Sequence, residues 1–308
     1  MCRGLIYLGQ PLLIENLLFR PDSALVNQAY TPKMLHMLNL AGFGMMAWDR
    51  RSHDPDAAYR YSSPTLPIFD RNLKSLAQKT RADCVLAHVR GVAYSTTVNI
   101  ADQNCHPFHF PGTKVAMAHN GDIYRIGEMK GTLRGHIKDA YARQIAGSTD
   151  SEWVYALLLS RLSDPTREPS REELITAVEE TIDILRRTRA THGIDISSSC
   201  NLFIATGEQV MGLRYCFDFG RFRTESPRQV HEANLSYLSL WFTLGREFGF
   251  HDEEWQMVGG EAEATSVLIA SEPLSTNTAN WLQVPEYSLV HADTTGGRPR
   301  LLVRALDA

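Results

Sequence analysis

The chain has 308 residues, of which 44% are hydrophobic and 21% are charged, as in an ordinary soluble globular protein. Its net charge of −4 gives no reason to expect nucleic acid or an anionic membrane as a partner, and no apolar run is long enough to cross a bilayer. Five cysteines without a CxxC spacing predict a reduced, cytoplasmic protein with one reactive thiol and several packed ones.

The first half of the chain alternates short strands with loops. Two strands are predicted over 2–8 and 12–14, around a Gln10-Pro11 turn, and a polar loop is predicted after Trp48. A short helix is predicted over 72–80, and further strands over 42–48, 84–90 and 114–119. The last of these ends at Asn120-Gly121, a dipeptide typical of tight turns.

Two capping boxes mark the start of helices in the middle of the chain. Thr149 to Glu152 precedes one apolar stripe at helical spacing, and Ser170 to Glu173 precedes another. After residue 198 the pattern returns to strands, predicted over 199–206, 209–217, 235–243, 265–271, 286–292 and 300–306, with surface insertions over 218–233 and 246–264. Strands, then helices, then strands predict a layered α+β fold in a single domain over 1–308.

Cys2 follows the initiator methionine and opens the first predicted strand. Aminopeptidases remove Met1 readily when the next side chain is small, so we expect Cys2 to become the mature N-terminus. A free N-terminal cysteine carries both a nucleophilic thiol and a base, its own α-amine, which titrates near pH ~8. A cysteine at position 2 is by itself weak evidence, and the other motifs decide its meaning.

Several motifs follow Cys2 in a fixed order: Gly42-Phe43-Gly44, Ala87 to Arg90, Asn104 to Phe108, His119-Asn120-Gly121 and Ser148 to Glu152. Together they resemble the glutaminase domain of class II glutamine amidotransferases, which are N-terminal-nucleophile hydrolases. The segment 269–274 is similar to a stand-alone branch that includes the amidotransferase-like subunit of a fungal glutathione-degrading complex. The resemblance implies a four-layer αββα sandwich of two mainly antiparallel sheets flanked by helices, with no cofactor.

The resemblance also implies a role for each matching residue. Cys2 is the nucleophile, and Asn120 with Gly121 forms the oxyanion hole, whose donors stabilise the tetrahedral intermediate. Arg90 is expected to bind the α-carboxylate of the glutamyl group, since a guanidinium fork fits a planar carboxylate. Asp150 is expected to receive the α-ammonium. Locally, Asn120-Gly121 is equally typical of a turn, and an acidic residue in a first helical turn is expected from the helix dipole alone.

Other polar residues near these motifs have plainer interpretations. His88 and His119 lie in apolar strand contexts and are expected to be packed supports, because the α-amine of Cys2 already supplies a base. Cys105 to His109 holds Cys, His and His within five residues, but no second ligand cluster favours a metal site, so none is expected. The family usually has an acidic residue where this chain has Ala41, which leaves the local hydrogen bonding and the fine substrate preference open.

Recognition of the leaving amine must come from residues beyond these motifs. The candidates are the stretch 19–30 and the basic residues Arg214, Arg221 and Arg223. The leaving half of glutathione ends in a carboxylate, so we expect Arg214 to supply part of the counter-charge. Solvated surface arginines are the equally weighted alternative.

Beside the glutaminase motifs the 308 residues leave no room for a synthase domain, so we expect a γ-glutamyl amide hydrolase acting on glutathione or a related compound. The resemblance implies a small-molecule γ-glutamyl substrate, a metallopeptidase-like partner subunit and self-association as options. The alternatives are the γ-glutamyl hydrolase step of ergothioneine-type biosynthesis, a glutaminase subunit that supplies ammonia to a partner, and an inactive partner-binding subunit.

Overall fold

The structure is a computed structural model that describes residues 2–34, 38–92, 100–222, 226, 239–294 and 299–307. Its centre is a seven-stranded antiparallel sheet with the order β13-β9-β12-β1-β4-β2-β3. In that order the strands are Leu282–Gln283, Trp241–Gly245, Ser266–Ala270, Arg3–Leu13, Arg81–Val89, Phe43–Trp48 and Tyr59–Ser63. The strand that follows Cys2, β1, is therefore an interior strand paired on both edges.

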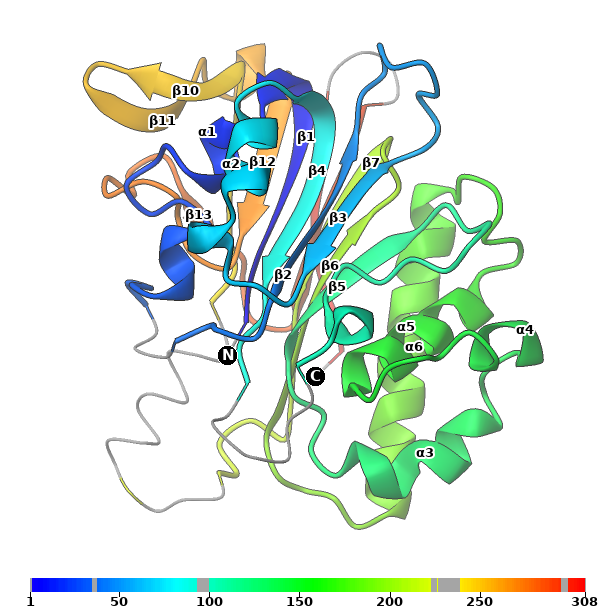
Figure 1. The fold of residues 1–308 in the computed structure, drawn as a ribbon. Coiled ribbons are helices and arrows are strands. Elements are labelled where there is room, and N and C mark those ends of the chain that lie inside the picture. Colours follow the sequence, from blue (N-terminus) through cyan, green and yellow to red (C-terminus); the bar gives the residue numbers. More distant parts are fainter. Residues whose placement is uncertain are drawn as a thin grey trace.

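A second, six-stranded sheet lies against the first. Its main order is β15-β14-β7-β6-β5, and β8 pairs with β6 off this path. In the order β15, β14, β7, β6, β5 and β8, the strands are Arg300–Ala305, Ser288–Asp293, Gln209–Arg214, Ser198–Ala205, Ala116–Gly121 and Cys216–Phe217. A separate hairpin, β10 (Glu247–His251) with β11 (Glu254–Val258), projects from one end of the molecule (Figure 1).

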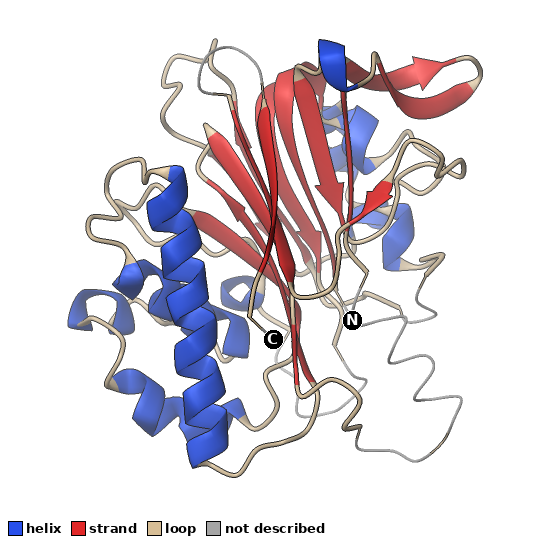
Figure 2. Ribbon diagram, turned by 180° about the vertical axis from the view of Figure 1, so that it is seen from behind, coloured by secondary structure: helices blue, strands red, loops and turns tan. Residues whose placement is uncertain are grey.

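Helices cover the outer face of each sheet and complete four layers (Figures 1 and 2). On the first sheet lie α1 (Glu15–Leu18) and α2 (Arg71–Ala77). On the second lie α3 (Ile126–Arg134), α4 (Asp139–Ala142), α5 (Asp150–Arg161) and α6 (Arg171–Thr191). Short 3-10 helices occur at Asn27–Ala29, Pro67–Phe69, Asp102–Asn104 and Glu261–Glu263. None of the helices in the described part of the chain is both long and apolar enough to span a membrane.

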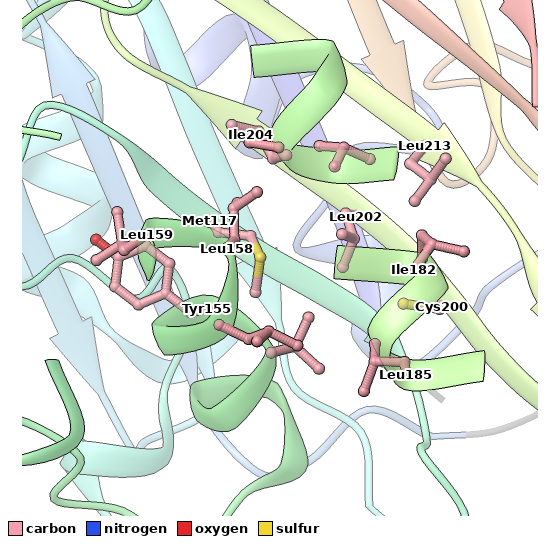
Figure 3. Close-up of a cluster of buried hydrophobic side chains, with 14 of the residues drawn as sticks. Met117, Tyr155, Leu158, Leu159, Ile182, Leu185, Cys200, Leu202, Ile204 and Leu213 are labelled. Carbon is pink, nitrogen blue, oxygen red and sulfur yellow. The ribbon is translucent and has the colours of Figure 1, made fainter. Parts of the chain in front are cut away.

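Three apolar layers hold these elements together. Strand alternation sends Ile6 and Leu8 of β1 into the layer between the sheets, against Phe203 of β6, while Leu5 and Tyr7 point to the outer face of the first sheet. The helical layer packs α5 and α6 on the second sheet, and Figure 3 shows part of this cluster. Its labelled residues are Met117, Tyr155, Leu158, Leu159, Ile182, Leu185, Cys200, Leu202, Ile204 and Leu213.

The fold class predicted from the sequence is confirmed, and the errors are local. The predicted turn at Gln10-Pro11 is wrong, because β1 runs without interruption from Arg3 to Leu13 and absorbs the proline at a register shift between Leu8 and Leu12. Asn120 and Gly121 are not a turn but the last residues of β5, paired with Asn201 and Cys200.

Several elements were missed, among them α3, α4 and β3. The helix α4 has four residues and buries none of them, and β3 is exposed or half-buried throughout, so neither of these two shows a strong sequence pattern. The helix α3 does bury Met129 and Leu133 at helical spacing, a signal that was overlooked. The insertion predicted over 246–264 contains the β10–β11 hairpin. Of the strand predicted over 235–243, residues 235–238 lie outside the described residues and the last three belong to β9.

Candidate active site

The thiol of Cys2 lies at the start of β1 and is buried, with 7% of the residue exposed. The backbone N–H of Gly91 donates to Cys2 Sγ at 3.3 Å, and the thiol donates to the Gly91 carbonyl at 3.4 Å. Since Gly91 follows Arg90 directly, these contacts bring two of the sequence-predicted residues together. Pairing of β1 with β4 on one side and β12 on the other holds this end of the strand in place.

Arg3, the residue after the Cys2 nucleophile proposed from the sequence, is fully buried. Its Nη1 donates to the Cys2 carbonyl at 3.0 Å, and its Nε lies 3.8 Å from Glu272 Oε2. Burial lowers the pKa of this guanidinium, and Glu272 acts in the opposite direction. The motifs found in the sequence assign no role to Arg3. A charged residue at position 3 of a buried strand was the available signal, since an unpaired arginine is rarely buried.

Arg90 follows β4 and is held through its backbone. Its N–H donates to the Gly42 carbonyl at 2.8 Å, and its carbonyl accepts from the Ala41 N–H at 2.9 Å. Gly42 has φ +118, and a Cβ added there would stand 2.8 Å from Cys105 Sγ, so both its conformation and its surroundings require glycine. Ala41 is fully buried, and its methyl group occupies the place where the family usually has an acid.

Asn120 and Gly121 end β5 on the second sheet. Asn120 Nδ2 donates to Ser271 Oγ at 3.2 Å, whereas its buried Oδ1 has no hydrogen-bond partner among the described residues. A Cβ on Gly121 would stand 2.1 Å from the Ser199 carbonyl, so the backbone can pass here only without a side chain. An orphaned amide oxygen in a buried position is uncommon and is typical of functional sites.

Asp150 is the first residue of α5, and the loop before it is fixed by hydrogen bonds. Its Oδ2 accepts from the Ile123 N–H at 2.7 Å and lies 3.9 Å from Nδ1 of His119, the neighbour of Asn120. The predicted N-cap is confirmed at Thr149, whose side chain accepts from the Glu152 N–H, but the return bond of a capping box is not made. The Glu152 carboxylate instead accepts from the N–H groups of residues 146 and 147, at 2.9 and 2.7 Å.

Three buried histidines lie beside these residues. His88 Nε2 is 3.1 Å from His106 Nδ1, and His119 Nδ1 is 2.9 Å from Ser151 Oγ. Burial lowers the pKa of His88 to about 3 and takes the pKa of His106 well below its usual range, so both rings are neutral near pH 7. The arrangement agrees with the expected supporting role of His88.

The residues of the Cys105 to His109 stretch turn toward different partners. Cys105 Sγ faces the carbonyls of Ser63 and Ala101, His106 faces His88, and His109 Nε2 lies 2.7 Å from the Thr113 carbonyl. Within the described ranges no group of three or more His, Cys, Asp or Glu side chains could hold a metal ion.

Arg214 ends β7 at the same end of the second sheet, two strands away from Asn120 in the order β7-β6-β5. It is buried, its Nη1 donates to the Val284 carbonyl, and its Nη2 lies 3.6 Å from Glu286 Oε1. Burial lowers the pKa of its guanidinium. Of the other two candidate arginines, Arg221 lies 3.2 Å from Asp195 on the surface, and Arg223 falls outside the described residues.

Comparison with known proteins places this geometry in a family context. The model of the class-II glutamine amidotransferases matches residues 61–216, which include Arg90, Asn120, Gly121 and Asp150. The probable glutamine amidotransferase DUG3 of Saccharomyces cerevisiae is 29% identical over 94% of this chain and 81% of its own length. The γ-glutamyl-hercynylcysteine sulfoxide hydrolase of Mycolicibacterium smegmatis is 29% identical over 41% of this chain and 52% of its own length.

Solved structures agree on the fold. A glutamine aminotransferase class-II domain protein from Silicibacter pomeroyi matches with a TM-score of 0.62 and 18% identity over 100% of both chains. The glutamine phosphoribosylpyrophosphate amidotransferase from B. subtilis matches with a TM-score of 0.51 and 13% identity, over 99% of this chain and 49% of its own. At such identities these two matches establish the N-terminal-nucleophile fold and nothing further.

Proposed function

The chain belongs to the class II glutamine amidotransferases, and on that premise we propose that it hydrolyses the γ-glutamyl amide bond of glutathione or a related γ-glutamyl compound. The observation that carries the proposal is the position of Cys2. Its thiol is held by Gly91 beside Arg90, and Ser271 connects the strand that follows it to Asn120. These contacts support a site in which Cys2 is the nucleophile, Arg90 the carboxylate-binding cation and Asn120 the amide donor.

In the proposed reaction the α-amine of Cys2, free after removal of Met1, takes the thiol proton. The sulfur attacks the γ-carbonyl carbon, and the negative charge forms on the carbonyl oxygen next to Asn120 and Gly121. The ammonium then gives its proton to the leaving amine as the C–N bond breaks, which leaves a thioester on Cys2. Water attacks the thioester, releases glutamate and restores the thiol.

Arg90 and Asp150 give the site its selectivity for a glutamyl group in this proposal. Arg90 pairs with the α-carboxylate, and Asp150 with the α-ammonium. The Asp150 carboxylate is well prepared for this task, because Ile123 and the loop held by Glu152 fix its position before any substrate arrives. A fixed binding group loses little conformational entropy on binding.

Glutathione is the favoured substrate because segment 269–274 resembles the stand-alone branch that includes a subunit of a glutathione-degrading complex, and the likeness to the yeast amidotransferase over 94% of this chain supports that branch. A metallopeptidase-like partner that would process the released half is part of the same proposal. The shorter likeness to the mycobacterial sulfoxide hydrolase supports a second candidate, a γ-glutamyl conjugate of a cysteine sulfoxide.

For the leaving half we propose that Arg214 supplies a counter-charge. Its buried Nε has no hydrogen-bond partner in the described part of the chain, and its ion pair with Glu286 is long at 3.6 Å. A carboxylate entering this end of the sheet would compete with Glu286 for the guanidinium.

The test measures glutamate release by purified protein whose N-terminus has been verified by intact mass. Glutathione, glutamine and a γ-glutamyl cysteine sulfoxide conjugate are compared, with Cys2→Ala as the blank. Turnover of glutathione with the highest kcat/KM supports the favoured substrate, and preference for the sulfoxide conjugate selects the second candidate. Preference for glutamine indicates an ammonia-supplying subunit. Absence of turnover on every γ-glutamyl amide, with Cys2 at the N-terminus, contradicts the function.

A further inference from the structure

A single hydroxyl group connects the two halves of the proposed site. Ser271, directly after β12, is fully buried, and its Oγ accepts the backbone N–H of Gly4 at 3.0 Å. The same Oγ accepts from Asn120 Nδ2 at 3.2 Å. Gly4 is two residues after Cys2 on the first sheet, whereas Asn120 ends a strand of the second sheet. Ser271 therefore touches both the nucleophile strand and the proposed oxyanion donor.

The backbone around Ser271 leaves its side chain little freedom. Its N–H donates to the Gly4 carbonyl at 2.9 Å, and its carbonyl accepts from Ser239 Oγ at 2.8 Å. A residue bonded at both backbone groups and buried on all sides presents its hydroxyl in one direction. The position of Oγ is thus set by β1 before Asn120 makes any contact with it.

Asn120 needs such a contact because its side chain has a choice of orientation. An asparagine amide can turn its oxygen or its nitrogen toward a developing oxyanion, and only the nitrogen stabilises negative charge. The bond to Ser271 uses one of the two hydrogens on Nδ2 and fixes the plane of the amide. The second hydrogen is then available to the oxyanion, at a constant position relative to Cys2.

We propose that Ser271 is a positioning residue that sets the orientation and place of the Asn120 amide relative to the Cys2 thiol. This inference rests on the proposed function, in which Asn120 donates to the oxyanion. It assigns Ser271 no contact with the substrate. An oxyanion donor must be aligned to within a fraction of an ångström, so it depends on a supporting contact. Loss of the Ser271 hydroxyl should therefore destabilise the transition state more than it weakens substrate binding.

The experiment is a double-mutant cycle between Ser271→Ala and Asn120→Ala, measured as kcat and KM on the best γ-glutamyl substrate. Removal of an oxyanion donor typically lowers kcat by about 10²–10³-fold, so we expect this range for Asn120→Ala. Ser271→Ala should lower kcat by roughly tenfold with KM nearly unchanged, because the donor stays but loses its alignment. In the Asn120→Ala protein, Ser271→Ala should have no further effect on kcat.

Ser266→Ala is the matched control. Ser266 is also fully buried and sits at the other end of β12, where its Oγ accepts a β1 backbone N–H, that of Gln10, at 3.1 Å. It shares with Ser271 the anchoring of β1 but has no bond to Asn120. Ser266→Ala should keep wild-type kcat, and Ser271→Thr, which retains the hydroxyl, should recover most of the activity that Ser271→Ala loses.

If Ser271→Ala does not fold, Ser271→Thr is compared with Ser271→Val, which has the same shape without the hydroxyl. Equal kcat for that pair, wild-type kcat for Ser271→Ala, or the same fractional loss in the presence and absence of Asn120 overturns the positioning role and leaves the proposed function intact. Absence of turnover by the wild type on every γ-glutamyl amide overturns both.

Discussion

Both ends of the second sheet bury polar side chains, but the two ends differ in how many of the buried polar atoms have a hydrogen-bond partner. At the far end, Gln209 Oε1 lies 2.8 Å from His291 Nε2, and Gln209 Nε2 donates to Glu168 and to the Pro169 carbonyl, each at 2.6 Å. Thr206 donates to the same Glu168 oxygen at 2.6 Å. Nearly every polar atom there has a partner within the network.

At the end where β1 and β5 meet, buried atoms remain without hydrogen-bond partners among the described residues. They are Nε and Nη2 of Arg3, Nδ1 of His88, Nε2 of His106, Oδ1 of Asn120 and Oγ of Ser199. The far end has fewer, such as Nδ1 of His291 and Nε of Arg171. Each such atom costs about 1–3 kcal/mol of desolvation. The contrast is what the proposed function predicts, in which the near end binds the substrate and the far end contributes stability.

The largest expected effect at the near end follows from Cys2→Ala. Since the thiol is the single nucleophile proposed, glutamate release should fall to the blank, while the thermal unfolding midpoint stays close to that of the wild type. The control is Cys216→Ala, which removes a buried thiol from β8 and should retain activity. Wild-type turnover by Cys2→Ala would exclude the mechanism.

The same prediction has a second arm that addresses the base. Insertion of a residue that prevents aminopeptidase processing before Cys2 should also abolish turnover, because the nitrogen of Cys2 would then be an amide. Intact mass verifies the N-terminus. Normal turnover in that protein would indicate an ordinary cysteine hydrolase with a separate base.

Arg90→Lys should lower kcat/KM on γ-glutamyl substrates by about 10–100-fold, because a lysine offers a point charge in place of a bidentate fork. Wild-type protein should in turn hydrolyse a substrate with a methylated α-carboxylate poorly, and Arg90→Lys should discriminate less between the acid and the ester. Equal turnover of acid and ester by the wild type removes Arg90 from its proposed role.

The comparison predicts effects of different size on stability from the removal of two buried amides. Gln209→Ala should lower the free energy of unfolding by about 2–4 kcal/mol, since it leaves His291 Nε2 without a partner and removes the bonds from Gln209 Nε2 to Glu168 and to the Pro169 carbonyl. Asn120→Ala should change it by less than about 1 kcal/mol, because it removes an orphaned oxygen together with one bond. Denaturant unfolding of the two variants measures both values. Equal losses would mean that the near end is as much a stabilising network as the far end.

The last prediction concerns pH. Burial lowers the pKa of His88 to about 3 and that of His291 to about 4, while both groups titrate near 6.5 when unfolded. At pH values between the folded and the unfolded pKa, the unfolded chain binds more protons than the folded chain. The stabilisation is therefore fully present above pH ~6.5 and is lost as the pH is lowered. Each extra proton corresponds to a slope of about 1.4 kcal/mol per pH unit. Unfolding midpoints at pH 7, 6, 5 and 4 measure it, and a flat profile would show that the rings are protonated in the folded state.

The fold could be predicted well where periodicity and caps coincide. Thr149 and Ser170 were correctly placed as helix N-caps, and the central strands were placed to within a few residues. Prediction failed where tertiary pairing overrides a local signal. Pro11 and Gly121 look like turn residues, but pairing on a long strand and the tight approach of Ser199 determine their conformation instead.

The candidate site divides in the same way. Sequence alone identified Cys2, Arg90, Asn120 and Asp150 as candidates, because residue type and surrounding motif predict a chemical role for each. Arg3, Glu272 and Ser271 could not be given roles, because these depend on pairing of β1 with a strand more than two hundred residues away. The hydrogen bond between Gly4 and Ser271 spans a sequence separation of 267. No local pattern contains that information.

That separation also affects the order of events during synthesis. The strand β1 leaves the ribosome first, but one of its two neighbours, β12, consists of residues 266–270. At about 5–20 residues per second, many seconds pass before β1 can gain its second neighbour. During this interval the segment around Cys2 cannot be fully enclosed, so under the proposed mechanism an aminopeptidase has time to remove Met1 before β12 completes the surroundings of the thiol.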